Sequence, residues 1–106
     1  MATDREYLRF LQEQCAGLDV RFRAMMGEYV FYYRDKLAGA VCDNRFMVKD
    51  VPAARALMPD ALLEPPYEGA KEQLVVDVLD NRHMLAELFE AMYPELPAPK
   101  LRRKKA

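Results

Sequence analysis

The sequence predicts a two-layer α+β domain, in which three helices pack against an antiparallel sheet of about five strands. Two observations support this prediction. Short segments that alternate apolar and polar residues follow one another through tight polar turns, as antiparallel strands do. Segments with apolar residues at helical spacing lie before and after them. The expected order is helix, four strands, helix, strand, helix.

The first helix is expected after residues 3–6, where Thr3 and Glu6 have the spacing of a capping box. Gly17 is placed to end this helix in a left-handed conformation. Apolar residues recur at helical spacing at Tyr7, Leu8, Leu11 and Cys15. We therefore expect a helix with one buried face and one solvated face.

Four strands are expected between residues 20 and 49. The segment 29–33 is aromatic and β-branched throughout, as in a central strand. After turns at 34–36 and 43–44, the segments 37–42 and 45–49 complete an antiparallel meander. The first strand, residues 20–26, alternates and places on one side Val20, Phe22, Ala24 and Met26.

The segment 29–33 has no polar face to present to water. Either helices cover both sides of the sheet, or one side meets a partner or a second copy of the chain. Gly27 is expected to allow a bulge or a positive φ before this strand, and Gly39 a close packing contact in the next one.

A short helix is expected over residues 52–58, capped by Asp50 and with Pro52 in its first turn. The segment 59–72 is rich in proline and is predicted to be an ordered loop. Residues 73–78 alternate again and are expected to form the fifth strand.

The last helix is expected to start at a cap formed by Asp80 or Asn81 and to end at Pro94. Its apolar stripe follows helical spacing at Leu85, Leu88, Phe89 and Met92. Residues 1–93 are thus predicted to form one domain. Residues 94–106 are interpreted as a proline-rich linker and a disordered basic tail.

The charges divide unevenly between these two parts. Five of the 16 basic residues lie in the last seven positions, at Lys100, Arg102, Arg103, Lys104 and Lys105. Residues 1–99 hold 11 basic and 17 acidic side chains, which is a net charge of −6. An acidic body argues against a nucleic-acid-binding fold surface. The tail could contact nucleic acid weakly and without sequence preference.

The N-terminus has no apolar core of a secretory signal, and no stretch approaches the roughly 20 apolar residues of a membrane helix. We therefore expect a cytoplasmic protein with no membrane association. In a reducing cytosol, Cys15 and Cys42 are interpreted as small buried hydrophobic residues.

The chain offers little for catalysis. It has no serine, one threonine and one histidine, His83, so a Ser-His triad is excluded. A zinc site from Cys15, Cys42 and His83 would draw single ligands from three separate elements, which is not the spacing of known zinc sites. We expect no catalytic residue, no metal and no cofactor.

The chain resembles a known bacterial family over roughly residues 4–93. The resemblance is carried by Met26-Gly27-Glu28-Tyr29, Tyr32-Tyr33, Lys36, Gly39, Asp43, Arg45, Lys49, Leu57-Met58-Pro59, Pro65-Pro66-Tyr67 and Gly69-Ala70-Lys71. In this order the residues are similar to the N-terminal domain of the TfoX/Sxy competence regulators.

The resemblance implies a fold like that of type III secretion chaperones, with helices against an antiparallel sheet. It also implies a role in transcription, because the family's competence regulators act with the cyclic-AMP receptor protein at promoters. No catalytic residue is implied. The longer regulators continue into a second, helical domain that has no counterpart here, so a stand-alone interaction module is expected.

Five residues are candidates for binding. Glu28, Lys49 and Lys71 are charged residues near strand ends, which either form internal ion pairs or face a ligand. Tyr67 and Lys71 lie on a proline-stiffened loop, a plausible contact surface. Tyr32 belongs to the aromatic strand that lacks a polar face.

These observations predict a non-catalytic module that binds a protein partner, such as a component of the transcription machinery, or that forms a homodimer through its sheet. One alternative is a small ligand-binding protein or enzyme that uses the loop from Tyr67 to Lys71. The other is a weak nucleic-acid binder that uses the basic tail.

Overall fold

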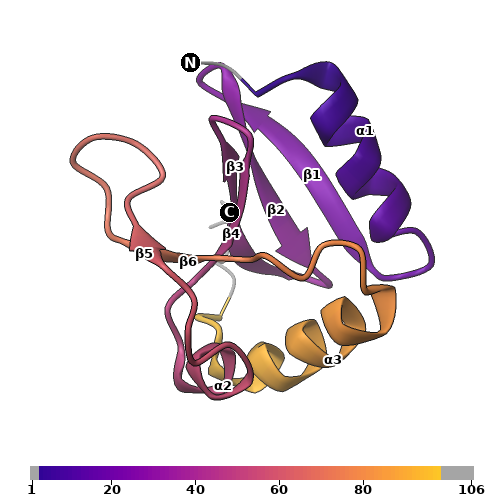
Figure 1. Ribbon diagram of the computed structural model, residues 1–106, viewed down its shortest axis with the longest axis vertical. Coiled ribbons are helices and arrows are strands. Elements are labelled where there is room, and N and C mark those ends of the chain that lie inside the picture. Colours follow the sequence, from indigo (N-terminus) through magenta and orange to yellow (C-terminus); the bar gives the residue numbers. More distant parts are fainter. Residues whose placement is uncertain (1–2, 99–106) are drawn as a thin grey trace, which may run out of the picture.

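The computed structural model describes residues 3–98 and confirms an α+β fold, with three helices and an antiparallel sheet of six strands (Figure 1). Along the chain, the elements are α1 (Arg5–Gln14), β1 (Val20–Met25), β2 (Glu28–Tyr33), β3 (Lys36–Cys42), β4 (Arg45–Val48), α2 (Pro52–Leu57), β5 (Leu63–Glu64), β6 (Gln73–Val75), α3 (Arg82–Met92) and the 3-10 helix η1 (Tyr93–Glu95). The strand order in the sheet is β1-β2-β3-β4-β6-β5.

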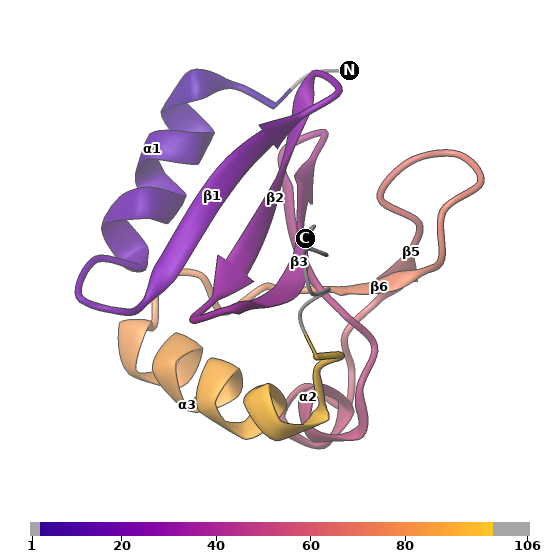
Figure 2. The same ribbon diagram turned by 180° about the vertical axis from the view of Figure 1, so that it is seen from behind.

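The helices all contribute to one hydrophobic core on one face of the sheet. Leu11 of α1, Ala54 of α2 and Leu88 of α3 are each fully buried in it. At its centre, the rings of Phe31 and Phe46 stack with centroids 4.7 Å apart. In Figures 1 and 2, α1 runs beside β1, whereas α2 and α3 lie together at the other end of the sheet.

Tight turns with positive φ angles join the first four strands. Met26 and Gly27 have φ angles of 53° and 87°, and Asp43 and Asn44 have 53° and 58°. In each of these turns, two successive residues with positive φ match the twist of the loop to that of the flanking strands. The positive φ expected at Gly27 is confirmed. Met26 does not belong to the first strand as expected, because it occupies the turn and is 95% exposed.

The capping box predicted at the first helix is wrong. Asp4 is the N-cap of α1, and its side chain makes no capping hydrogen bond. Thr3 turns to the sheet instead, where its amide donates to Glu28 Oε1 (2.9 Å) and its hydroxyl accepts from the Asn44 amide (3.2 Å). Tertiary hydrogen bonds thus replace the local cap.

The cap predicted for the second helix is also wrong. Val51 is the N-cap of α2, and the Asp50 carboxylate pairs with Arg55 (2.6 Å). Glu95 of η1 supplies the missing acceptor, since its Oε1 accepts from the Ala53 amide (2.8 Å).

The loop predicted over residues 59–72 contains a strand that sequence patterns did not indicate. β5 is two residues long and pairs with β6 at the edge of the sheet. Alternation cannot show in so short a segment. β6 is itself shorter than expected, although the Val76 amide still donates to the Phe46 carbonyl (2.8 Å) beyond its end.

The C-terminal helix follows its prediction. The Asn81 side chain caps α3 by accepting from the Met84 amide (3.0 Å), and the four residues of the predicted stripe are fully buried. After Met92 the chain continues into η1, and Leu96 is buried in the core. The packed part therefore extends beyond the predicted boundary at residue 93. The basic residues from Lys100 to Lys105 lie outside the described residues.

A polar network ties the turn after β2 to the end of α3. The Tyr33 hydroxyl donates to Glu90 Oε2 (2.6 Å), and Arg34 forms an ion pair with the same carboxylate. The Tyr93 hydroxyl donates to Asp35 Oδ1 (2.5 Å). Burial and the hydrogen bond to Glu90 raise the pKa of Tyr33 to about 12.

Both cysteines are free and buried, as expected. Burial raises the pKa of Cys15 to about 11, so its thiol is protonated at neutral pH. Among residues 3–98, no helix has the length and apolar character needed to cross a membrane.

We expect Gly39→Ala to lower the free energy of unfolding by about 2–3 kcal/mol, the scale of overpacking in a core. A Cβ at this position would lie 1.9 Å from the Met47 carbonyl oxygen and 2.7 Å from the Phe31 ring. Urea denaturation measures the change. Gly69→Ala is the control, because it has positive φ but open space around it, and should cost only about 1 kcal/mol. Equal losses in the two variants would contradict the close contact at Gly39.

Candidate functional site

The two faces of the sheet differ in what covers them. Phe31 and Tyr33 point into the core beneath the helices, whereas Val30 and Tyr32 lie on the opposite face. On that opposite face a smaller apolar cluster is formed by Val30, Ala40, Cys42, Met47 and Val75. The second strand is thus apolar on both sides. One side belongs to the main core, and the other side belongs to this smaller cluster. We call the other side the open face.

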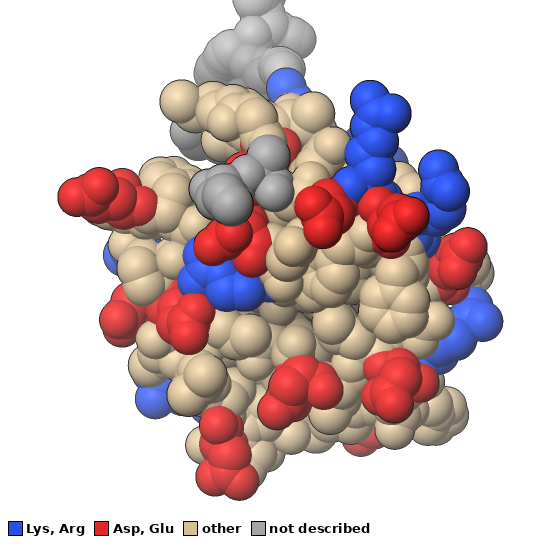
Figure 3. All heavy atoms as spheres, turned by 45° about the horizontal axis from the view of Figure 1, so that its top comes forward, with Lys and Arg blue, Asp and Glu red and all other residues tan. Residues whose placement is uncertain are grey.

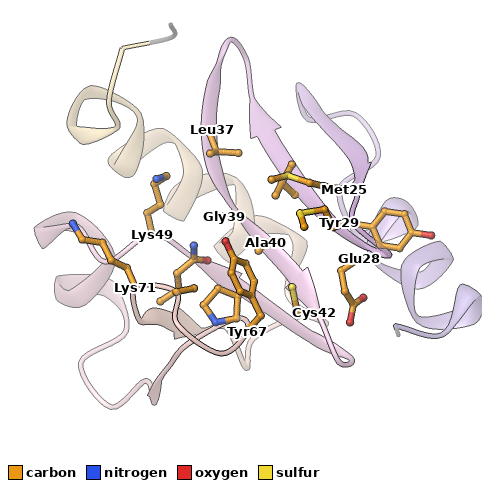
Figure 4. A pocket seen from close by; sticks show the side chains of 15 residues that line it. Met25, Glu28, Tyr29, Leu37, Gly39, Ala40, Cys42, Lys49, Tyr67 and Lys71 are labelled. Carbon is orange, nitrogen blue, oxygen red and sulfur yellow. The ribbon is translucent and has the colours of Figure 1, made fainter. Parts of the chain in front are cut away.

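A hollow of about 490 Å³ lies on the open face, between the strands and the loop of residues 65–72. Its lining comes from the sheet and from this loop, and consists of Met25, Met26, Glu28, Tyr29, Val30, Leu37, Gly39, Ala40, Cys42, Lys49, Pro66, Tyr67, Ala70, Lys71 and Gln73. Figure 4 shows Ala40 and Cys42 at the centre and Tyr67 in front of them. In Figures 1 and 2 the loop extends on the side of the sheet away from α1.

Arg45 holds the start of this loop. Its Nη1 pairs with Glu64 Oε1 (2.6 Å) and donates to the Pro65 carbonyl (3.3 Å), while Nη2 donates to the Pro66 carbonyl (3.1 Å). The planar guanidinium suits several acceptors at once. Pro66 is buried by this arrangement, and Tyr67 is left 62% exposed.

Two lysines lie together on one side of the hollow, Lys49 at the end of β4 and Lys71 before β6 (Figure 4). Neither ammonium group has an ion-pair partner among residues 3–98. Beside them, Gln73 Oε1 is buried and accepts no hydrogen bond within that same range. The hollow is therefore apolar with one cationic side.

Glu28 lies on the side of the hollow opposite the lysines (Figure 4), where its carboxylate has a structural task. Oε1 accepts from the Thr3 amide (2.9 Å) and Oε2 from the Asp43 amide (2.8 Å), which joins the N-terminus to the turn after β3. Burial alone would raise the pKa of Glu28, but the hydrogen bonds from Thr3 and Asp43 lower it below its ordinary value of 4.5.

The structure thus brings four of the five predicted binding residues to one hollow: Glu28, Lys49, Tyr67 and Lys71. Tyr32 shares the open face but does not line the hollow. The Arg21 guanidinium lies over its ring, with the guanidinium carbon 5.2 Å from the ring centroid. No ion pair forms at Glu28, Lys49 or Lys71 among the described residues.

Sequence reasoning missed Arg45 and Gln73 as site residues. Arg45 was visible only as one position of the family resemblance, and its partners at Glu64, Pro65 and Pro66 lie about 20 positions along the chain. Nothing in the pattern of β6 distinguished the amide of Gln73 from a solvated strand residue.

A thiol, that of Cys42, also lines the hollow. Burial raises the pKa of Cys42, which keeps its thiol protonated and weakly nucleophilic. His83 is exposed on α3 and is not among the lining residues. Within residues 3–98, no cluster of three or more histidine, cysteine or acidic side chains is arranged to hold a metal ion.

Replacing Arg45 with glutamine should release the loop. Hydrogen bonds to charged groups contribute about 1.5–3 kcal/mol, so we expect amide exchange across residues 66–72 to rise at least about tenfold. Hydrogen–deuterium exchange measures this, with Arg55→Gln as the control that removes a surface ion pair elsewhere. Unchanged exchange in Arg45→Gln would show that the loop holds itself in place.

The lowered pKa of Glu28 makes the free energy of unfolding depend on pH in the acidic range. Because the folded state lowers this pKa, the carboxylate stabilises the protein above pH 4.5 and loses its effect as the pH falls through the lowered value. The stability advantage of wild type over Glu28→Gln should therefore be constant above pH 5 and shrink in acid. Denaturation at several pH values measures it, with Glu87→Gln as the control. An advantage that persists unchanged at pH 2 would refute the assignment.

No protein-family model matches the chain, and no solved structure gives a significant match to it. The chain is 37% identical, over 107 residues, to a protein of Spirochaeta aurantia described as an uncharacterized 12.7 kDa protein in the trpE 5′ region. The match covers 99% of this chain and 93% of that protein, so the two correspond over nearly their whole length. The chain therefore belongs to the same family as this Spirochaeta aurantia protein.

Proposed function

We propose that the chain is a non-catalytic interaction module, which binds a protein partner through the open face of its sheet. One observation carries this proposal. Of the five large hydrophobic side chains that are exposed among residues 3–98, three line the same hollow: Met25 at 46%, Met26 at 95% and Tyr67 at 62% exposure. Grouped exposed apolar residues mark interaction sites, whereas scattered ones need no explanation.

The chemistry of these side chains suits protein contacts. Methionine adapts its shape to a partner, and tyrosine offers a large apolar surface with a polar tip. Arg45 fixes the loop that presents Tyr67, so little entropy is lost there on binding. A rigid aromatic residue beside flexible thioethers is the composition expected of a binding surface.

The resemblance to the TfoX/Sxy regulators supports a partner in the transcription machinery. The charge of the body supports a protein partner over nucleic acid, since acidic side chains are spread over the face shown in Figure 3. The absence of serine from the chain and the raised pKa of the Cys42 thiol favour a role without covalent chemistry.

The proposal is tested by partner capture with matched variants. Tyr67→Asp places a charge in the rim of the hollow and should reduce capture of a partner from the source cells at least about tenfold, as loss of an interface anchor does. Leu62→Asp is the control, because Leu62 is 64% exposed but does not line the hollow. Quantitative mass spectrometry of both pull-downs, beside wild type, gives the comparison.

The outcomes are distinct. Loss with Tyr67→Asp and retention with Leu62→Asp supports the open face as the interface. Equal capture by all three proteins contradicts it. If wild type sediments as a concentration-dependent dimer and only Tyr67→Asp is monomeric, the partner is a second copy of the chain.

A further inference from the structure

The hollow on the open face has the dimensions of a small-molecule site. Its volume of about 490 Å³ lies within the range of roughly 300–1,000 Å³ that such sites occupy. Ala40 and Cys42 form its floor and are only 4% and 5% exposed. The part of a ligand that lies on them would therefore be shielded from water. The floor is apolar, because these two side chains belong to the small apolar cluster of the open face.

Strand alternation places Lys49 on this face, and the segment before β6 brings Lys71 to the same hollow. The Lys49 amide donates to the Ala38 carbonyl (2.8 Å), which extends the pairing of β3 and β4 by one residue and keeps the Lys49 side chain on the side of Met47. Lys71 precedes Gln73 by two positions and lines the hollow with it. Two cations thus flank one side of an apolar floor.

Acidic side chains near the hollow do not pair with these cations. Asp50, Glu72 and Glu95 line an adjacent hollow together with the two lysines, but no ion pair with either lysine forms among residues 3–98. Both carboxylate oxygens of Glu28 accept backbone amides, and Glu28 lies on the opposite side (Figure 4). The amide of Gln73 has a buried oxygen without a partner among residues 3–98.

From this arrangement we propose that the hollow binds a small amphipathic anion, a monocarboxylate with an apolar body. The body lies over Ala40 and Cys42, and the carboxylate lies between Lys49 and Lys71. Met26 and Tyr67 at the rim stay accessible to a protein partner. The ligand site therefore goes beyond the proposed interaction and does not rest on it.

The test uses octanoate as the probe, titrated into the full ¹⁵N-labelled chain and followed by NMR. We expect saturable shifts at the amides of Val30, Ala40, Cys42, Lys49 and Lys71. Octylammonium has the same apolar chain with the opposite charge and should bind at least about tenfold more weakly. Acetate, which lacks the apolar body, should cause no saturable shifts.

Variants separate charge from apolar contact. The double variant Lys49→Gln, Lys71→Gln should weaken octanoate binding at least about tenfold, whereas Arg9→Gln, an exposed position on α1, should leave it unchanged. Ala40→Leu fills the floor and should abolish binding of octanoate.

Equal affinity for octanoate and octylammonium would overturn the proposal, since it would show an apolar surface without anion recognition. Non-saturable shifts would overturn it as well. Octanoate binding is read from the isolated chain and partner capture from the pull-down, so failure of the ligand site and failure of the proposed function are distinguishable. If octanoate fails but a peptide ending in an apolar residue and a free carboxylate gives the same shifts, the small-molecule site is refuted and the anion belongs to the partner.

Discussion

The close approach of β4 to Gly39 is the constraint on which the rest of the structure depends. The Met47 carbonyl oxygen would lie 1.9 Å from a Cβ at this position, and the Phe31 ring 2.7 Å from it. Only glycine therefore lets the stack of Phe31 on Phe46 form beside the paired strands. The Phe89 ring of α3 packs against both rings, so the stack lies on the face that the helices cover. The loop of residues 65–72 lies on the other face.

The open face is maintained by polar contacts as much as by packing. Arg45 anchors the loop through backbone carbonyls, and Glu28 joins the N-terminus to a hairpin turn. These contacts hold the edges of the hollow, and Ala40 and Cys42 form its floor. Apolar groups are exposed at the rim, and the two lysines on one side form no ion pair within residues 3–98. We propose that this face serves recognition.

Features set by neighbours in the sequence were predictable, and those set by distant partners were not. The stripe and cap of α3 and the left-handed turn at Gly27 follow local rules. The caps at Thr3 and Asp50 failed because residues far along the chain offer better partners. β5 exists only through its pairing with β6. In the site, the charged residues near strand ends could be identified from the sequence. Arg45 was missed because it acts by donating hydrogen bonds to backbone carbonyls about 20 positions away.

The two cysteines test, within one molecule, whether the hollow admits small molecules in the native state. Cys42 lines the hollow and Cys15 lies in the helix-side core, yet they are almost equally buried, at 5% and 4% exposure. Alkylation by iodoacetamide at increasing urea measures access to each thiol. We expect Cys42 to react at a rate that low urea does not change, whereas Cys15 should react only through global unfolding. Reaction of both thiols at one rate set by unfolding would contradict it.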